Sequence, residues 1–190
     1  MTTLKKEFMA GLSYDEFVFV AKENVDLLAT MRSRATAPPE YAERVAATGR
    51  RWHLLVMTED WCGDGVNIVP WVDALAASSP DIDIRIIRRD EHLELMDAHL
   101  TNGRSRSIPI VLLLDDSYVE RAWWGPRPLD LQRWFMTDEA QAMDKSARFK
   151  ELRRFYARDR GRSILEEITA MVERVAAQLD APPAARKAAV

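Results

Sequence analysis

The chain has 190 residues, 47% of them hydrophobic, and its 27 basic and 30 acidic side chains nearly cancel to a net charge of −3. This length suits one ordinary core with material left for terminal helices, and the charge balance excludes the strongly basic character of a nucleic-acid-binding protein. Charged residues interrupt the apolar residues of positions 1–20, so we expect no signal peptide, no membrane association and a cytoplasmic location.

The first 50 residues are predicted to be helical. Apolar residues recur at three- and four-residue spacing over 14–31, and Ser13 and Glu16 form a candidate capping box. We therefore expect one amphipathic helix over this stretch. A shorter helix over 40–47 follows two prolines. Residues 1–50 are interpreted as an N-terminal helical extension.

Short apolar runs and amphipathic segments then alternate. The expected strands are 52–57, 82–87, 110–114 and 118–124, and the expected helices are 66–77, 91–100 and 129–135. The last two strands must pair antiparallel because only the turn at 115–117 joins them, whereas the strands linked by helices can lie parallel. This order predicts an α/β fold with a mixed central sheet over residues 51–138.

The C-terminal part is predicted to add two helices, over 142–156 and 163–179. We expect residues 139–180 to pack on the core and residues 181–190 to be a disordered tail. Four aromatic residues lie close together in the sequence, which indicates core packing under these helices, with a homodimer interface as the alternative. They are Trp123, Trp124, Trp134 and Phe135.

A basic cluster lies at the junction of the two C-terminal helices. Its members are Arg153, Arg154, Arg158, Arg160 and Arg162. The simplest interpretation is a solvated helix face, and contact with an acidic partner or a phosphate is the alternative.

Three local motifs lie in register with one another. Trp61-Cys62-Gly63 falls between the first strand and the next helix, and Pro70 follows Cys62 by eight residues. Ser107-Ile108-Pro109 precedes a buried strand, and Gly125 follows Pro109 by sixteen residues. Over residues 51–135 this arrangement resembles the thioredoxin family, which implies a thioredoxin-like fold with a cis peptide bond before Pro109.

The segment 59–64, read as Glu-Asp-Trp-Cys-Gly-Asp, looks most like a bacterial branch with the motif Asp-Trp-Cys-Gly-Asp-Cys. The chain departs from the family at two positions. Gly65 replaces the second, resolving cysteine, so the intramolecular step that releases reduced substrate cannot occur. Val56 stands where many thioredoxins bury an aspartate that assists that step. Ordinary dithiol activity is therefore not expected.

Cys62 is the only cysteine and the candidate nucleophile. A position at a helix N-terminus would favour its thiolate. Three nearby carboxylates disfavour a second anion, and two arginines ahead of Pro109 are placed to offset that repulsion. The carboxylates are Glu59, Asp60 and Asp64, and the arginines are Arg104 and Arg106. The sequence does not decide which effect is larger, although it favours an exposed position for Cys62.

Two functions follow from the resemblance. The first is monothiol exchange, in which the Cys62 thiolate attacks a protein or small-molecule disulfide and glutathione or another low-molecular-weight thiol releases the product. Trp61, Gly63, Asp64, Ile108 and Pro109 would then contact substrate. The second is a non-catalytic module that holds an extended peptide or a protein partner in the groove between Cys62 and Pro109.

No bound cofactor or metal is expected. The three histidines are scattered and have no ligand-like spacing. Cys62-Gly63-Asp64-Gly65 shares two of four residues with the Cys-Gly-Phe-Ser motif of monothiol glutaredoxins, but the lysine and glycine signatures of their cluster-binding site are not clear in this sequence.

Overall fold

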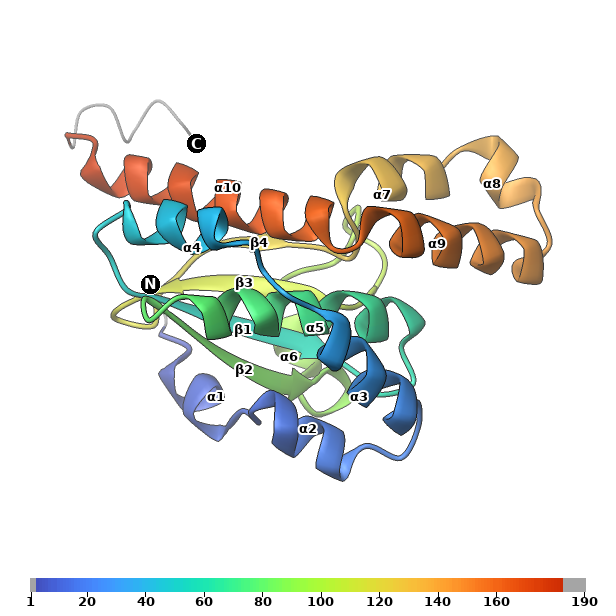
Figure 1. Cartoon of the computed structure of the whole chain (residues 1–190), viewed down its shortest axis with the longest axis horizontal. Helices are drawn as coiled ribbons and strands as arrows, with labels where there is room; N and C mark the ends of the chain where they lie inside the picture. Colours follow the sequence, from blue (N-terminus) through green and yellow to red (C-terminus); the bar gives the residue numbers. More distant parts are fainter. Residues whose placement is uncertain (1–2, 183–190) are drawn as a thin grey trace.

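The computed structural model describes residues 3–182 and places a four-stranded mixed sheet at the centre of the chain (Figure 1). The strands are β1 (Trp52–Thr58), β2 (Ile82–Arg88), β3 (Ile110–Asp115) and β4 (Glu120–Trp124), and their order in the sheet is β2-β1-β3-β4. β1 is parallel to β2 and antiparallel to β3, and β3 is antiparallel to β4. The α/β architecture and the antiparallel final pair are as predicted.

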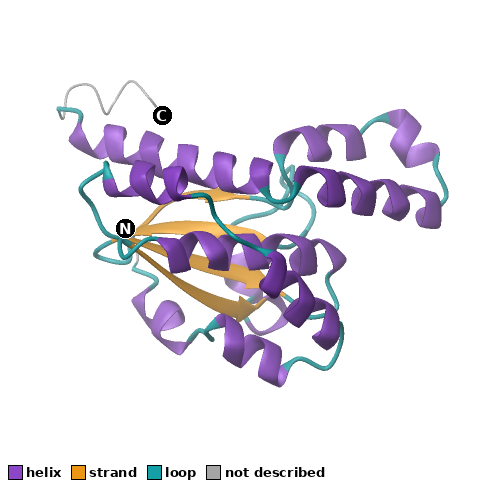
Figure 2. Cartoon of the chain, viewed as in Figure 1, coloured by secondary structure: helices purple, strands orange, loops and turns teal. Residues whose placement is uncertain are grey.

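Helices cover both faces of this sheet (Figure 2). In chain order they are α1 (Lys5–Ala10), α2 (Tyr14–Val20), α3 (Val25–Arg34), α4 (Pro39–Ala46), α5 (Gly63–Ser78), the 3₁₀-helix η1 (Arg89–Glu91), α6 (Leu93–Asp97), α7 (Leu129–Phe135), α8 (Asp138–Ala142), α9 (Lys145–Asp159) and α10 (Arg162–Asp180). None of the helices between residues 3 and 182 combines the length and apolar character needed to cross a bilayer.

The alternation of side chains along β1 divides the interior into two clusters. Leu54 and Val56 point to the larger cluster, which also contains buried residues of α5 and α10. Leu55 and Met57 point to the smaller cluster, together with residues of α1 and α6. Cys62 belongs to this smaller cluster. The position of Cys62 is therefore set by the packing on the face opposite to α5 and α10.

The single helix predicted over 14–31 is wrong, because the chain forms α2 and α3 with a break between them. The Ser13–Glu16 capping box is confirmed at the start of α2. The break is held by Asp60, whose carboxylate accepts a hydrogen bond from the Lys22 N–H at 2.7 Å, and by Asn24, whose side chain donates to the Asp60 carbonyl at 2.8 Å. Asn24 directly precedes α3 and has φ of 54°, so the chain is not helical between the two helices at this residue.

Two further predicted helices have different bounds in the structure. The helix predicted over 91–100 is shortened to α6, just after η1, and the helix predicted over 142–156 is shifted to α9, with the separate helix α8 before it. Asp144 sets the later start of α9, because its side chain accepts a hydrogen bond from the Ala147 N–H and caps the helix. α7 has the predicted bounds, and α10 lies alongside α4 and next to β4 (Figure 1). The disordered tail predicted for 181–190 falls largely outside the described residues.

Candidate functional site

Cys62 caps the N-terminus of α5, at the carboxyl end of β1. Its Sγ accepts a hydrogen bond from the Gly65 N–H at 3.3 Å and lies 3.4 Å from the Ile108 carbonyl oxygen, to which the thiol donates. Only 7% of the residue is exposed. This burial differs from the exposed position expected from the turn. The helix-terminal position is as predicted.

The Ile108–Pro109 peptide bond is cis, as the resemblance implied. Ile108 and Pro109 are both buried, and they immediately precede β3, the antiparallel partner of β1. The first strand and the third thus bring Cys62 and Ile108 into direct contact, although they are 46 positions apart.

Burial raises the pKa of the Cys62 thiol to about 11. The hydrogen bond from Gly65 and the positive charge of Arg127 act in the opposite direction, while the negative charge of Asp64 adds to the rise. Loss of solvation is therefore larger than the stabilisation of a thiolate by the helix N-terminus. The cysteine of this site is held as a neutral thiol.

Asp64, which the sequence predicted to contact substrate, lies inside the protein. One carboxylate oxygen accepts a hydrogen bond from the Tyr156 hydroxyl at 2.8 Å, and the other pairs with the Arg127 guanidinium at 2.6 Å. Asp64 is 8% exposed. Burial and the charge of Asp64 hold the pKa of Tyr156 well above its usual value. The carboxylate joins α5 to α9 and to the segment after β4, and it does not face solvent.

Gly65 has no room for a side chain. A Cβ built at this position would lie 2.4 Å from the Thr58 hydroxyl oxygen and 3.4 Å from the Cys62 Cβ. The Thr58 hydroxyl is itself buried without a hydrogen-bond partner among the described residues. Thr58 therefore occupies the volume into which a second cysteine would have to project. Val56 is fully buried in the larger cluster.

A sequence model of the family described as thioredoxin matches residues 11–147 of the chain. The chain belongs to the thioredoxin family. The match is wider than the 51–135 segment that carries the sequence resemblance, and it includes α2, α3, α4 and α8. α1, α10 and most of α9 lie outside the match.

Two solved structures have a fold similar to that of this chain. One is a protein of unknown function from Pseudomonas aeruginosa, with 22% sequence identity, a TM-score of 0.72, and coverage of 91% of this chain and 98% of that chain. The other is an HIV epitope-scaffold protein, with 19% identity, a TM-score of 0.67, and coverage of 90% and 98%. A search of curated proteins found no match.

Trp61 and Gly63 are the exposed residues of the motif in this thioredoxin-family protein. Trp61 is 43% exposed, and the Arg89 guanidinium lies over its ring at 4.9 Å from the centroid. Arg89 also donates a hydrogen bond to the Arg106 carbonyl at 3.2 Å. The indole is thus connected through one arginine to the segment that leads into Ile108.

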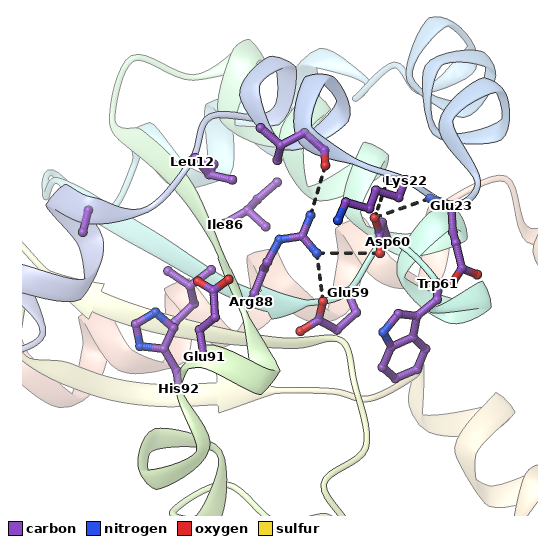
Figure 3. Close-up of a pocket in the computed structure, with 13 residues that line it drawn as sticks. Leu12, Lys22, Glu23, Glu59, Asp60, Trp61, Ile86, Arg88, Glu91 and His92 are labelled. Atoms are coloured by element: carbon purple, nitrogen blue, oxygen red, sulfur yellow. Dashed lines mark hydrogen bonds and ion pairs between the residues drawn. The ribbon is translucent and has the colours of Figure 1, made fainter.

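The other two carboxylates of the motif are structural. Glu59 pairs with Arg88 at 3.1 Å and accepts a hydrogen bond from the Asp90 N–H at 3.0 Å. Burial opposes ionisation of Asp60, but hydrogen bonds from Lys22, Glu23 and Arg88 outweigh it and lower the pKa of Asp60. Figure 3 shows the Arg88 guanidinium between these two carboxylates. These three side chains and Trp61 line a hollow of about 640 Å³.

The cation that acts on Cys62 is Arg127, which the sequence analysis did not single out. Arg106, expected near the thiol, pairs instead with Asp97 on the surface, at 2.6 Å. The one sequence signal that could have indicated Arg127 is its place just after Gly125, the glycine that the family resemblance puts at the end of the last strand.

Within residues 3–182, no group of three or more histidine, cysteine, aspartate or glutamate side chains is arranged to hold a metal ion. His53 is buried and stacks on Tyr118 with ring centroids 4.2 Å apart, and His99 bonds to Glu120 at 2.8 Å. These two histidines have structural partners.

Proposed function

We propose that the protein is a non-catalytic thioredoxin-family module that binds an extended polypeptide segment along Trp61 and the Ile108–Pro109 turn. The observation that carries this proposal is the state of Cys62, whose buried thiol donates to the Ile108 carbonyl and has its pKa raised to about 11. A thiol of that kind is a poor nucleophile at neutral pH, because the thiolate is the attacking species.

The position of Gly65 supports the same conclusion. A dithiol cycle needs a second sulfur near the first, and the Thr58 hydroxyl fills the space beside Gly65. The motif thus lacks both a reactive first thiol and room for a resolving one. The features of the family's site that remain are the exposed Trp61 and the cis Ile108–Pro109 turn.

These features suit recognition of the backbone of an extended polypeptide. The Ile108 N–H makes no hydrogen bond to any residue between 3 and 182, so it is free to donate to a carbonyl of an added segment. The exposed Trp61 ring is connected through Arg89 to the segment before Ile108. An extended segment bound beside Ile108 would gain main-chain hydrogen bonds and aromatic contact.

A second candidate function is monothiol exchange with an external thiol such as glutathione. It is favoured by the hydrogen bond from the Gly65 N–H to the Cys62 Sγ and by the position of that sulfur at the N-terminus of α5. Both features stabilise a thiolate. For exchange to occur, the segment around Cys62 would have to open to solvent.

The two functions are separated by one pair of measurements on the wild-type protein and on Cys62→Ser. We expect no turnover of a low-molecular-weight mixed disulfide with glutathione above the level of Cys62→Ser. From a library of cysteine-free linear peptides we expect binders whose affinities for the two proteins agree within about twofold. Turnover that requires Cys62 would instead support monothiol exchange.

The contribution of the indole is tested with two tryptophan variants. Trp61→Ala should weaken the selected peptides by about tenfold, since a desolvated aromatic contact is a typical anchor of binding. Trp123→Ala is the matched control, because Trp123 has a similar exposure of 38% and lies on β4. Equal losses in the two variants would show that the peptides do not bind at the proposed face.

A further inference from the structure

A second cavity lies between the C-terminal ends of α3 and α9, over the outer side of α5. Its volume is about 480 Å³, which is within the range of small-molecule sites. Arg34 contributes from α3, Asn67 and Trp71 from α5, and Arg153 and Arg160 from α9 and its C-terminal cap. Three separate elements therefore meet around one concave space.

The cavity carries three positive charges and no lining acid. Arg34, Arg153 and Arg160 all line it, and no aspartate or glutamate does. Across residues 3–182, these three guanidinium groups form no ion pair, hydrogen bond or ring contact. Three guanidinium groups around one cavity without counter-charge favour an anion, and their planar donors match the geometry of phosphate oxygens.

The two acidic side chains of α9 are already engaged. Glu151 pairs with Arg154, and Asp159 accepts hydrogen bonds from the backbone and hydroxyl of Ser163. Asp64, which accepts a hydrogen bond from the lining residue Tyr156, pairs with Arg127. The positive charge of the cavity is therefore not neutralised from within the described protein.

The inner surface of the cavity is aromatic and rigid. Trp71 is half-buried, and the turn between α9 and α10 fits closely against it, because a Cβ added at Gly161 would lie 2.1 Å from a ring carbon of Trp71. The Tyr156 hydroxyl is fixed by its bond to Asp64. The Asn67 side chain donates to the Gly63 carbonyl at 2.7 Å. A flat ring could lie against this surface without reorganising it.

We propose that this cavity binds a small organic phosphate that carries a flat ring, such as a nucleoside phosphate. The phosphate oxygens would bond to Arg34, Arg153 and Arg160, and the ring would lie against Trp71. The concave shape favours a small molecule over an acidic protein segment, which would be expected to bind on a flatter surface. This site is independent of Cys62 and of the peptide-binding proposal.

The test is calorimetric titration of the full chain with ADP, inorganic pyrophosphate and a short acidic peptide as separate probes. We expect saturable binding of one ADP, weaker binding of pyrophosphate because it lacks the ring, and no displacement of ADP by the peptide. Arg153→Ala and Arg160→Ala should each weaken ADP by about tenfold, as expected for loss of a charge-assisted bond.

Arg158→Ala is the matched control. Arg158 has the same charge as Arg153 and Arg160, and it lies in the last turn of α9, near the same end of the helix dipole. It does not line the cavity. We expect its affinity for ADP to stay within about twofold of wild type. Thermal unfolding of each variant confirms that it is folded, and Arg153→Lys provides a second variant that keeps the charge.

Several outcomes would overturn the proposal. They are the absence of saturable ADP binding up to about 1 mM, equal losses in Arg158→Ala and Arg153→Ala, equal affinity for ADP and pyrophosphate, and tight binding of the acidic peptide in place of ADP. The last outcome would assign the cavity to an acidic protein segment.

Discussion

A cysteine at the start of a helix normally gains thiolate character from the amides of the first turn. Cys62 has that position and receives the Gly65 N–H, yet its pKa is raised because the sulfur is packed in the smaller cluster and Asp64 adds a negative charge. The helix terminus lowers the pKa of Cys62, whereas burial and Asp64 raise it. At this residue the effect of burial is the larger one.

The close approach of Thr58 to Gly65 predicts a penalty for restoring the second cysteine. Gly65→Cys places a Cβ 2.4 Å from the Thr58 oxygen, so the free energy of unfolding should fall by about 1 to 3 kcal/mol. Thr58→Ala removes the obstructing hydroxyl. Urea unfolding of both single variants and the double variant under reducing conditions should show a favourable coupling of at least about 1 kcal/mol. Additive effects would contradict the proposed clash.

The pairing of Asp64 with Arg127 and Tyr156 predicts a large loss of stability when the Asp64 carboxylate is replaced by an amide. Asp64→Asn leaves the Arg127 charge buried without its partner, so the protein should lose about 3 kcal/mol of stability in urea unfolding. The apparent pKa of Cys62 should fall at the same time, because Asp64 raises it. Asp130→Asn is the control, since Asp130 is exposed and pairs with Arg133 on the surface, where little change is expected.

Failure of Asp64→Asn to destabilise the protein more than Asp130→Asn would show that the buried pair contributes nothing to stability.

The network of Asp64, Arg127 and Tyr156 could not be predicted from the sequence, because Asp64 and Tyr156 are 92 positions apart and no local pattern relates them. The contact between Cys62 and Ile108 was predictable through the family resemblance, since each lies in its own recognisable motif.

At the scale of elements, regular patterns predicted strands and helices well, but long-range contacts set several boundaries. The strands β1 and β3 are continuous apolar runs, and α7 has the predicted bounds. The break between α2 and α3 depends on Asp60, 38 positions from Lys22, so the helical periodicity over 14–31 gave no sign of it. Hydrophobic periodicity reports which face is buried and cannot detect a distant capping residue.

The turn between α9 and α10 predicts a sharp contrast between two glycines. Gly161 has φ of 74° and no space for a Cβ beside Trp71, whereas Gly103 has φ of 68° and nothing within 4 Å. Gly103→Ala should therefore cost only the backbone strain, about 1 to 2 kcal/mol. Gly161→Ala should cost at least about 1 kcal/mol more in urea unfolding. Equal costs would mean that the turn adapts freely around the indole.

His99 joins α6 to β4 in a way that predicts a dependence on pH. Burial opposes its protonation, but bonds from its two ring nitrogens to Glu120 and to the Leu95 carbonyl raise its pKa above the ordinary 6.5. A raised pKa gives stability that is present below pH 6.5 and is lost as the pH rises through the folded-state value.

Glu120→Gln should therefore destabilise the protein at pH 6 by more than it does at pH 9, as measured by urea unfolding at each pH. Glu94→Gln, an exposed substitution on α6, should show no such difference. A destabilisation by Glu120→Gln that is constant across this range would contradict the assigned role of His99.

At the scale of the whole molecule, the larger core extends from the sheet into the C-terminal helices. Buried residues of α10 such as Ile168 and Val172 share one cluster with Val56 and Val111 of the sheet. Trp124 of β4 also donates a hydrogen bond to Glu167 of α10 at 2.7 Å. Three of the four aromatic residues predicted to pack under these helices contact this cluster, and Trp123 remains 38% exposed.

The division of the core into two clusters accounts for the low reactivity assigned to Cys62. The two clusters lie on opposite faces of the sheet, and Cys62 is packed into the smaller one with Met57 and Ile110. The fold has kept the thioredoxin arrangement of a cysteine beside a cis-proline turn, and has enclosed the thiol within it. The central claim is that this cysteine does not act as a thiolate in the folded protein.

The measurement that tests this claim most directly is the rate of Cys62 alkylation by iodoacetamide against pH, in the native protein and in the unfolded protein. We predict a native rate that rises without levelling below about pH 10, consistent with a pKa of about 11, and an unfolded reference that titrates near 8.5. A native rate that reaches its plateau with an apparent pKa below 8.5 would contradict the claim and would assign the site to monothiol exchange.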